Sequence, residues 1–238
     1  MHSNRYTFLF AAGISVITAI LLAFASQGLK PLQDANLALD TKTSILHAVR
    51  LDGLERAAIE KTYTEQVKEL VINSAGEEIS GVSATSIVLK DELKKPLEAR
   101  QLPLYEFSDE AGKKYYIMPL RGTGLWGPIW GYISLEGDFN TVHGAYFDHK
   151  SETPGLGAEI SEKPFQEQFQ GKKIMSDDNN FVSVHVVKKA AKFNLGTEHR
   201  VDGISGGTIT SNGTDQMLKL CIEPYLTYFG KITPPASN

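Results

Sequence analysis

Residues 201–212 read VDGISGGTITSN and lead into residues 213–228, which are predicted to form a helix. Glycines among serines and threonines allow consecutive backbone N–H groups to converge on an anion, and the N-terminal end of a helix adds partial positive charge. The same residue types also make an ordinary glycine-rich turn followed by a Ser, Thr or Asn helix cap. The residues alone therefore leave two interpretations open, an anion-binding loop and a helix cap.

Outward from this loop, the sequence predicts strands mixed with helices. Strand-like composition or alternation marks four segments, at residues 115–120, 127–136, 141–147 and 181–189. Helical spacing marks residues 54–71 and also residues 158–172, where Pro164 interrupts it. The elements follow no regular βαβ order, so the predicted fold class is α+β, with a single mixed domain.

The composition is that of a globular protein, with 42% apolar and 22% charged residues in a chain of 238. Arg5 and Lys30 are the only charged residues among the first 30, so the remainder holds 22 basic and 28 acidic residues, a net of −6. An acidic domain does not attract nucleic acid, and any anion site must be built locally from backbone amides. The single cysteine, Cys221, excludes an intrachain disulfide, cysteine-ligated zinc and iron–sulfur clusters, and burial in the C-terminal helix is its expected state.

Residues 6–25 are twenty consecutive residues without charge or proline. A helix of that length spans about 30 Å, the thickness of a bilayer core. The run is longer than the apolar part of a typical signal peptide and ends in an imperfect cleavage site, so we expect a retained anchor. Arg5 gives a weak positive-inside bias toward a cytoplasmic N-terminus. We therefore predict residues 1–30 as a cytoplasmic stub and transmembrane anchor, and residues 31–238 as an exported domain that begins with a connector at 31–52.

Two further motifs are better explained by packing than by chemistry. The GxGxxG pattern at 122–127 lacks the helix that a dinucleotide site needs, because Pro128 interrupts it, so we expect these glycines to permit close backbone packing near Trp126 and Trp130. His143 and His149 have no evident third ligand, and no metal site is predicted. No GxSxG nucleophile elbow is present, and we predict no catalytic residue.

Residues 202–210, DGISGGTIT, resemble the flavinylation motif of FMN-binding domains, D-x-x-(S/T)-G-(A/G)-T-x-(S/T). The resemblance implies that Thr208 carries FMN through a phosphoester bond. Gly207 stands where the family usually has alanine, and this change leaves room at the phosphate. The segment SGVSATS at 80–86 superficially echoes the motif but lacks the preceding aspartate, and we interpret it as a loop.

A second block extends the resemblance to nearly the whole chain. The segments ETPGLG (152–157) and LRGTGLWG (120–127) are similar to the C-subunit family of the sodium-translocating NADH:quinone reductase. The N-terminal anchor, LDTKTSIL (39–46), PFQEQFQGKKI (164–174) and the C-terminal helix also fit that family. Residues 74–110 match least well, and we expect them to be variable decoration.

The resemblance also implies a cofactor-binding role for each part of the two motifs. Ser205, Thr210 and the amides of Gly206 and Gly207 are expected at the phosphate, and Asp202 and the glycines are expected to give a flavin transferase access to the loop. The loop of residues 152–157 is expected against the isoalloxazine ring, with Leu156 as an apolar wall and Thr153 or backbone amides at the polar edge of the ring. The remaining residues assigned to the site are Glu152, Gly155, Gly157, Leu125 and Trp126.

The function implied is an electron-relay subunit with covalent FMN in a bacterial inner-membrane complex, its domain periplasmic. Electrons would come from NADH and pass to a quinone, while other subunits pump sodium, because one helix without an embedded charge offers no ion path. The expected partners are those subunits, a flavin transferase and membrane lipid, without nucleic acid. Two alternatives stay open: the G subunit of the related ferredoxin:NAD oxidoreductase, and a membrane-tethered module without a cofactor.

Overall fold

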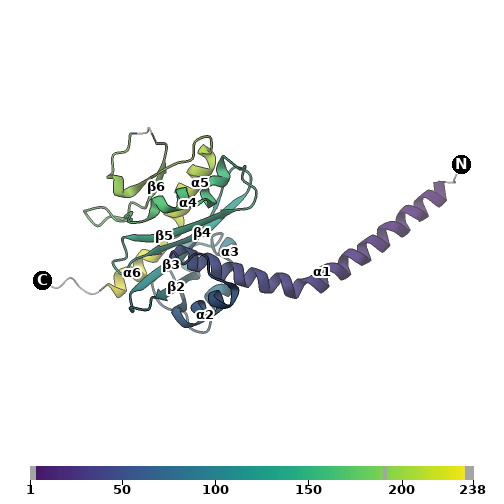
Figure 1. Cartoon of the computed structure of the whole chain (residues 1–238), viewed down its shortest axis with the longest axis horizontal. Helices are drawn as coiled ribbons and strands as arrows, with labels where there is room; N and C mark the ends of the chain where they lie inside the picture. Colours follow the sequence, from purple (N-terminus) through teal and green to yellow (C-terminus); the bar gives the residue numbers. More distant parts are fainter. Residues whose placement is uncertain (1–3, 190–191, 234–238) are drawn as a thin grey trace. The chain divides into compact units, whose positions relative to one another are not determined.

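The computed structural model describes residues 4–189 and 192–233, and the chain divides into two compact units at the Lys42/Thr43 boundary. Helix α1 (Asn4–Ala48) supplies the first unit and contributes its last residues to the second (Figure 1). The helix is long and apolar enough to cross a membrane. It continues through Pro31, so the segment expected as a polar connector with a short helical patch is helical as far as Ala48.

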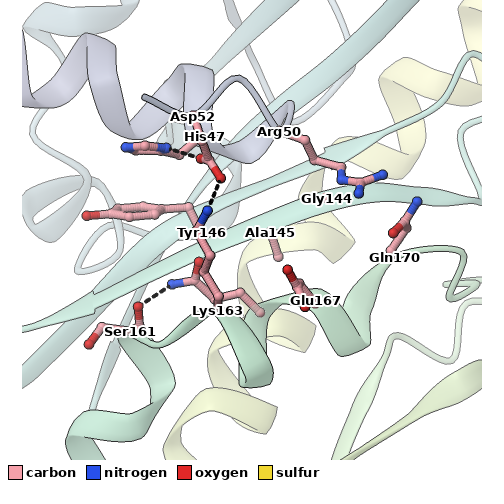
Figure 2. A pocket seen from close by; sticks show the side chains of 11 residues that line it. His47, Arg50, Asp52, Gly144, Ala145, Tyr146, Ser161, Lys163, Glu167 and Gln170 are labelled. Carbon is pink, nitrogen blue, oxygen red and sulfur yellow. Dashed lines mark hydrogen bonds and ion pairs between the residues drawn. The ribbon is translucent and has the colours of Figure 1, made fainter. Parts of the chain in front are cut away.

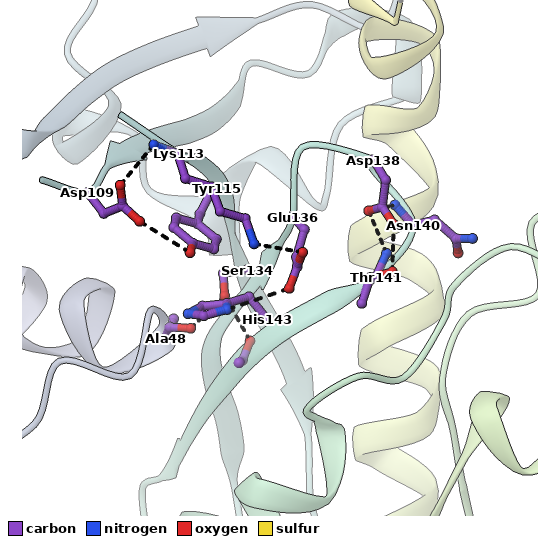
Figure 3. Close-up of polar contacts among 11 residues, drawn as sticks. Ala48, Asp109, Lys113, Tyr115, Ser134, Glu136, Asp138, Asn140, Thr141 and His143 are labelled. Atoms are coloured by element: carbon purple, nitrogen blue, oxygen red, sulfur yellow. Dashed lines mark hydrogen bonds and ion pairs between the residues drawn. The ribbon is translucent and has the colours of Figure 1, made fainter. Parts of the chain in front are cut away.

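The end of α1 belongs to the core of the second unit. Ile45, Leu46 and Ala48 are no more than 1% exposed, in contrast to the exposed apolar residues earlier in the helix. The carbonyl oxygen of Ala48 accepts a hydrogen bond of 2.6 Å from the buried Ser134 hydroxyl (Figure 3). Gly144 lies against the same carbonyl, since a Cβ there would come within 2.6 Å of its oxygen. The last turns of α1 are therefore fixed onto the sheet.

The second unit is built on a five-stranded antiparallel sheet in the order β1-β2-β3-β4-β5. Figure 1 labels the strands β2 to β5 of this sheet. The strands are β1 (Val67–Ile72), β2 (Leu102–Ser108), β3 (Lys114–Thr123), β4 (Pro128–Leu135) and β5 (Val142–His149). The predicted strands at 115–120, 127–136 and 141–147 are confirmed as β3, β4 and β5. The mixed α+β class with one N-terminal apolar helix is also confirmed.

Helix α5 (Thr208–Ile222) packs along β3, over one face of the sheet. Met217, Leu218 and Ile222 enter the main hydrophobic core beside Met118 and Leu120 of β3. The approach is close because two glycines remove side chains at the contact: a Cβ at Gly122 would lie 2.8 Å from that of Met217, and one at Gly213 would overlap the Thr123 carbonyl. Of the 122–127 glycines, Gly122 permits close packing as expected, but its neighbour is Met217 of α5 and not Trp126 or Trp130.

Shorter elements complete the unit. They are α2 (Arg56–Gln66), η1 (Ala84–Ser86), α3 (Leu89–Glu92), η2 (Leu97–Ala99), η3 (Gly157–Ser161), α4 (Lys163–Gln166), η4 (Glu167–Phe169), β6 (His185–Val187), η5 (Thr197–His199), β7 (Arg200–Asp202), η6 (Glu223–Tyr225) and α6 (Leu226–Ile232). The parallel pair β6–β7 carries the chain into α5. The strand predicted at 181–189 is thus reduced to three residues, and the helix predicted at 158–172 is a series of short turns around Pro164.

Two predictions of local structure are wrong. The helix expected over 54–71 ends at Gln66, because the chain then enters β1, where Leu70, Val71 and Ile72 are buried and pair with β2. The segment expected as variable decoration, 74–110, contains β2 itself. The hydroxyl of the fully buried Tyr225 donates a 2.7 Å hydrogen bond to the β2 residue Pro103. That segment is therefore tied both to the sheet and to the C-terminal helices.

Candidate functional site

Three loops that are distant in sequence enclose a hollow of about 210 Å³ at the N-terminus of α5. The loop between β3 and β4, the loop after β5 and the loop before α5 each supply part of the wall. Thr208 is the first residue of α5 and is exposed to this hollow. The predicted residues that line it are Leu125, Trp126, Glu152, Thr153, Leu156, Gly157, Gly206, Gly207, Thr208 and Thr210.

A buried carboxylate holds the three loops together. Glu152 is 4% exposed, and its Oε2 accepts a 2.6 Å hydrogen bond from the hydroxyl of Thr210 on α5. Its Oε1 accepts one of 2.8 Å from the backbone N–H of Trp126. Burial opposes ionisation, but the hydrogen bonds from Thr210, Trp126 and Leu125 outweigh it and hold the pKa of Glu152 below its ordinary value. Glu152 and Thr210 thus bond to each other beneath the hollow.

Glycines allow the 152–157 loop to lie directly on the loop before α5. A Cβ at Gly157 would overlap both the Glu152 carboxylate and the Thr210 hydroxyl. Gly206 has a φ of +77°, and a Cβ there would lie 2.6 Å from the Leu156 side chain. Any side chain at Gly157 would therefore break the contact that joins the loops, and one at Gly206 would also strain the backbone.

The backbone at the start of α5 presents free donors. The first helical hydrogen bond runs from the Ser211 N–H to the Gly207 carbonyl, at 2.8 Å. The N–H groups of Thr208, Ile209 and Thr210 precede that bond, so they belong to the set that an α-helix leaves unpaired at its N-terminus. The Gly207 amide, in contrast, donates to the Ile204 carbonyl at 3.1 Å. An anion beside Thr208 would meet unpaired N–H groups and the positive end of the helix dipole.

Large apolar side chains lie exposed along the rim of the hollow. The exposed fractions are 51% for Leu125, 65% for Trp126, 41% for Leu156 and 55% for Ile209. Ile209 is a wall residue that the sequence analysis did not assign, although an isoleucine between two threonines at a helix start is a signal that could have found it. Four such side chains around one concavity form a surface suited to a flat apolar ring.

The comparisons with known proteins agree with this geometry. A family model of the FMN-binding domain matches residues 124–223, the span that contains all three loops. The C subunit of the Na(+)-translocating NADH-quinone reductase of Haemophilus ducreyi is 32% identical over 91% of this chain and 90% of its own length. The chain belongs to this C-subunit family.

Solved structures support the same assignment. The crystal structure of the C subunit from Parabacteroides distasonis is 38% identical and superposes with a TM-score of 0.76, covering 88% of this chain and 98% of that one. The structure of the Shewanella oneidensis protein is 25% identical with a TM-score of 0.68, over 81% and 95% of the two chains. The predicted family is therefore confirmed.

Three predicted site residues of this member of the C-subunit family lie outside the hollow. Asp202 lies in β7 and accepts a 3.1 Å hydrogen bond from the Arg200 guanidinium. Ser205 is exposed in the turn before α5. Gly155 has a φ of +74°, and its N–H donates to the carboxylate of Glu159 at 2.9 Å. Ser205 and Gly155 directly precede the wall residues Gly206 and Leu156, whereas Asp202 lines a different hollow beside Gly203 and Ile204.

The two histidines considered as metal ligands have other partners. The Nδ1 atom of His149 accepts a 3.1 Å hydrogen bond from the Glu152 N–H, so it supports the loop of the hollow. His143 lies against the ring of Tyr115, with 4.2 Å between the centroids, and burial lowers its pKa (Figure 3). Within residues 4–189 and 192–233, no group of three potential metal ligands is found.

Cys221 is 4% exposed in α5, as expected. Its thiol donates a 3.5 Å hydrogen bond to the Arg121 carbonyl. Burial raises the pKa of this thiol to about 11, so the neutral form persists and the group is unreactive. The cysteine serves the contact between α5 and β3.

Proposed function

We propose that this chain carries FMN on Thr208 through a phosphoester bond and relays electrons as the C subunit of a sodium-translocating NADH:quinone reductase. The observation that carries the proposal is the place of Thr208: an exposed hydroxyl at the first residue of α5, inside a hollow lined by both predicted motifs. Family membership and the match to an FMN-binding domain support it.

The residues present fit the two halves of FMN. The unpaired N–H groups at the start of α5 suit the phosphate, and they supply positive potential inside an otherwise acidic domain. The exposed side chains of Leu125, Trp126, Leu156 and Ile209 suit the faces of the isoalloxazine ring, whose burial would remove apolar surface from water. Bound FMN supplies the electron transfer, and the protein contacts tune its potential.

Different residues of the chain would attach the cofactor and position the loops around it. Thr208 offers the hydroxyl that would be esterified, and it acts as an attachment point rather than a nucleophile in electron transfer. Glu152 and Thr210 position the start of α5 through their 2.6 Å hydrogen bond, and Glu152 also fixes the Leu125–Trp126 loop. Gly206 lines the hollow and Ser205 precedes it in the same turn, so both would be candidates to bind the phosphate. Covalent attachment would keep an exported protein from losing its cofactor.

The wider assignment follows from the family. We infer that the chain works with the other subunits of the complex, that a separate flavin transferase loads it, and that the α1 anchor lies in lipid with the folded domain on the periplasmic side. The domain boundaries proposed are residues 1–30 and 31–238. The chain has no site for NADH among its predicted motifs, so the isolated protein should not oxidise NADH.

In-gel fluorescence of the denatured chain, taken from cells that express a flavin transferase, tests the attachment. The native chain should give a fluorescent band whose flavin mass maps to the peptide that contains Thr208, and Thr208→Val should give none. Thr85→Val is the matched control, because Thr85 lies in the SGVSATS segment that echoes the motif. That variant should fluoresce like the native chain.

A native chain without flavin, alongside a transferase that labels a known substrate, would contradict the proposal. The loop would then be a helix cap, and the tethered module without a cofactor would take its place. The ferredoxin:NAD oxidoreductase alternative predicts the same band, so the genes that neighbour this one decide between the two complexes.

A further inference from the structure

A second concave surface adjoins the flavin loop, and its charge is uniform. Lys90, Arg121 and Lys150 line an open hollow of about 770 Å³ together with the indole of Trp130. These cations come from α3, β3 and the end of β5, so the fold gathers them from three separate segments. Its other lining residues carry no charge. In a domain with a net charge of −6, a hollow whose charged lining residues are all cations requires an explanation.

None of the three cations is neutralised by a carboxylate within the described part of the chain. No ion pair joins Lys90, Arg121 or Lys150 to any described acid. Asp91, the chain neighbour of Lys90, pairs with Lys94 at 2.7 Å, and Asp148, the neighbour of Trp130 on β5, accepts the His149 N–H at 2.7 Å. The charged residues that line the hollow are therefore cations without an ion-pair partner among the described residues.

The hollow near the end of α1 provides the contrast (Figure 2). There Asp52 accepts hydrogen bonds from His47 and, at 2.7 Å, from Lys163, and Glu167 lies opposite Arg50 in the lining. The His47 ring stacks on Tyr146 with 5.4 Å between the centroids. Acidic and basic side chains balance at that surface, so it would not favour a partner of either charge.

The basic hollow shares one loop with the flavin site. Residues 124–127 border both: Leu125 and Trp126 line the flavin side, and Gly127 lines the basic side. The Lys150 N–H donates to the Pro128 carbonyl at 3.1 Å, and the Ser151 hydroxyl donates to the Trp126 carbonyl at 3.3 Å. The backbone of Lys150 is thus held next to the loop that carries Trp126.

We propose that this basic hollow, lined by Lys90, Arg121, Lys150 and Trp130, docks an acidic segment of the protein that exchanges electrons with the flavin. The inference rests on the proposed function, because it names the partner surface of that same site. The partner would present aspartate or glutamate side chains on a protruding loop, seated beside Trp126.

Charge and shape favour a protein segment over the alternatives. An aromatic side chain bordered by charged residues is typical of protein interfaces, and the half-buried Trp130 provides one here. A concave surface is filled by a protruding loop, whereas a flat bilayer would span it. Complementary charge also steers two proteins into one orientation, and a domain that must meet a redox partner repeatedly benefits from that steering.

Carbodiimide coupling of the assembled complex tests the docking directly. The reagent joins a lysine amine to a carboxylate in contact with it, forming an amide with loss of water. We expect peptide mass analysis to find Lys90 or Lys150 joined to an aspartate or glutamate of another subunit. The absence of any such product, while other contacting pairs in the complex are coupled, would overturn the proposal.

Charge reversal gives the functional test in membranes that contain the whole complex. The double variant Lys90→Glu and Lys150→Glu should slow NADH-driven quinone reduction on the order of tenfold at low salt, and the deficit should shrink as salt screens the charges. Lys68→Glu with Lys231→Glu is the matched control, since both lysines are exposed, lie on other elements and make the same change in net charge. The double variant with arginine at positions 90 and 150 should keep the native rate.

The fluorescent flavin band distinguishes failure of the proposed function from failure of the docking inference. If the native chain lacks covalent flavin, the proposed function fails whatever the lysines do. If all variants carry flavin and the glutamate pair behaves like its control, only the docking inference fails. Loss of binding to phosphatidylglycerol vesicles in the glutamate pair, without cross-links to another subunit, would assign the hollow to anionic lipid and would also overturn the inference.

Discussion

Glu152 shows how much one side chain can organise. Its two oxygens accept hydrogen bonds from different loops, and the geometry leaves no room for another residue at Gly157. Thr210 and the Trp126 backbone, both neutral, donate hydrogen bonds to this carboxylate, so its charge is stabilised mainly by hydrogen bonds. Stability of the site should therefore depend on the protonation of this residue.

Glu152→Gln should lower the free energy of unfolding by about 1–3 kcal/mol at pH 7, because an amide cannot accept at both positions. The folded-state pKa of Glu152 lies below the unfolded value of about 4.5, so its stabilisation is full above pH 4.5 and is lost as the pH falls through the folded value. Urea unfolding at pH 7 and pH 4 should show a smaller difference between native and variant at the lower pH.

The exposed Glu110 provides the control for that series, because its change to glutamine should leave unfolding unchanged at both values. A constant difference between the native chain and Glu152→Gln across this range would mean that the carboxylate charge does not stabilise the fold.

Gly157→Ala should weaken the same junction from the opposite loop. The added methyl would overlap the atoms that form the Glu152–Thr210 bond, and overpacking of this kind costs about 1–3 kcal/mol. We expect a lower melting temperature and less covalent flavin. Gly137→Ala is the control, since the nearest atom to its Cβ would be 3.9 Å away. Equal stability of both variants would show that the loops can move apart freely.

At the scale of elements, α5 serves the core and the site together. Its N-terminus carries Thr208, and the rest of the helix packs on β3. The packing is close because Gly122 of β3 and Gly213 of α5 have no side chain at the contact. A change in how α5 lies on β3 should therefore displace the start of the helix. Stability and cofactor attachment are coupled through this one helix.

Gly213→Ala tests that coupling. Alanine favours helices over glycine by about 1 kcal/mol, yet the new Cβ would overlap the Thr123 carbonyl, so we expect net destabilisation and reduced flavin incorporation. Gly230→Ala in α6, where nothing lies within 4 Å of the added atom, should be neutral or stabilising. Thermal unfolding of the two variants separates steric cost from helix propensity, and stabilisation by both would contradict the packing argument.

The sequence predicted those elements whose pattern is local. The strands β3, β4 and β5 follow one another with short turns, and their composition was sufficient. The end of α2 at Gln66 could not be predicted in the same way, because the next residues form β1 only by pairing with β2. The β2 residues that pair with β1 lie some 30 to 40 positions later in the chain. The motif likewise predicted Thr208 and its loop as the candidate site, which line one hollow in the structure. The hydrogen bond between Glu152 and Thr210 joins residues 58 apart, so it follows from the tertiary fold.

At the scale of the molecule, the boundary between the two units falls inside a helix. Residues from Thr43 onward belong to the second unit, and Ile45, Leu46, Ala48 and Val49 are buried in it. The folded domain therefore includes the end of the helix that supplies the anchor.

Two truncations should differ accordingly. A chain of residues 43–238 should unfold cooperatively without detergent, whereas residues 53–238 should be unfolded or strongly destabilised. Each buried aliphatic side chain contributes about 1.5–3 kcal/mol, and a domain of this kind has only about 5–15 kcal/mol in total. Circular dichroism and urea unfolding of both chains measure this, and equal stability would mean that residues 43–52 are a dispensable linker.

The distribution of the hollow's walls along the chain has a consequence for biosynthesis. The first wall is translated near residue 125, the second near 152, and the third only at 206–210. While the ribosome still covers the third segment, Glu152 has no Thr210 to bind and Leu156 has no loop to lie on. The site therefore forms only after residues 206–210 have left the ribosome, so a maturation enzyme that recognises the assembled hollow would act only on chains that extend past this segment.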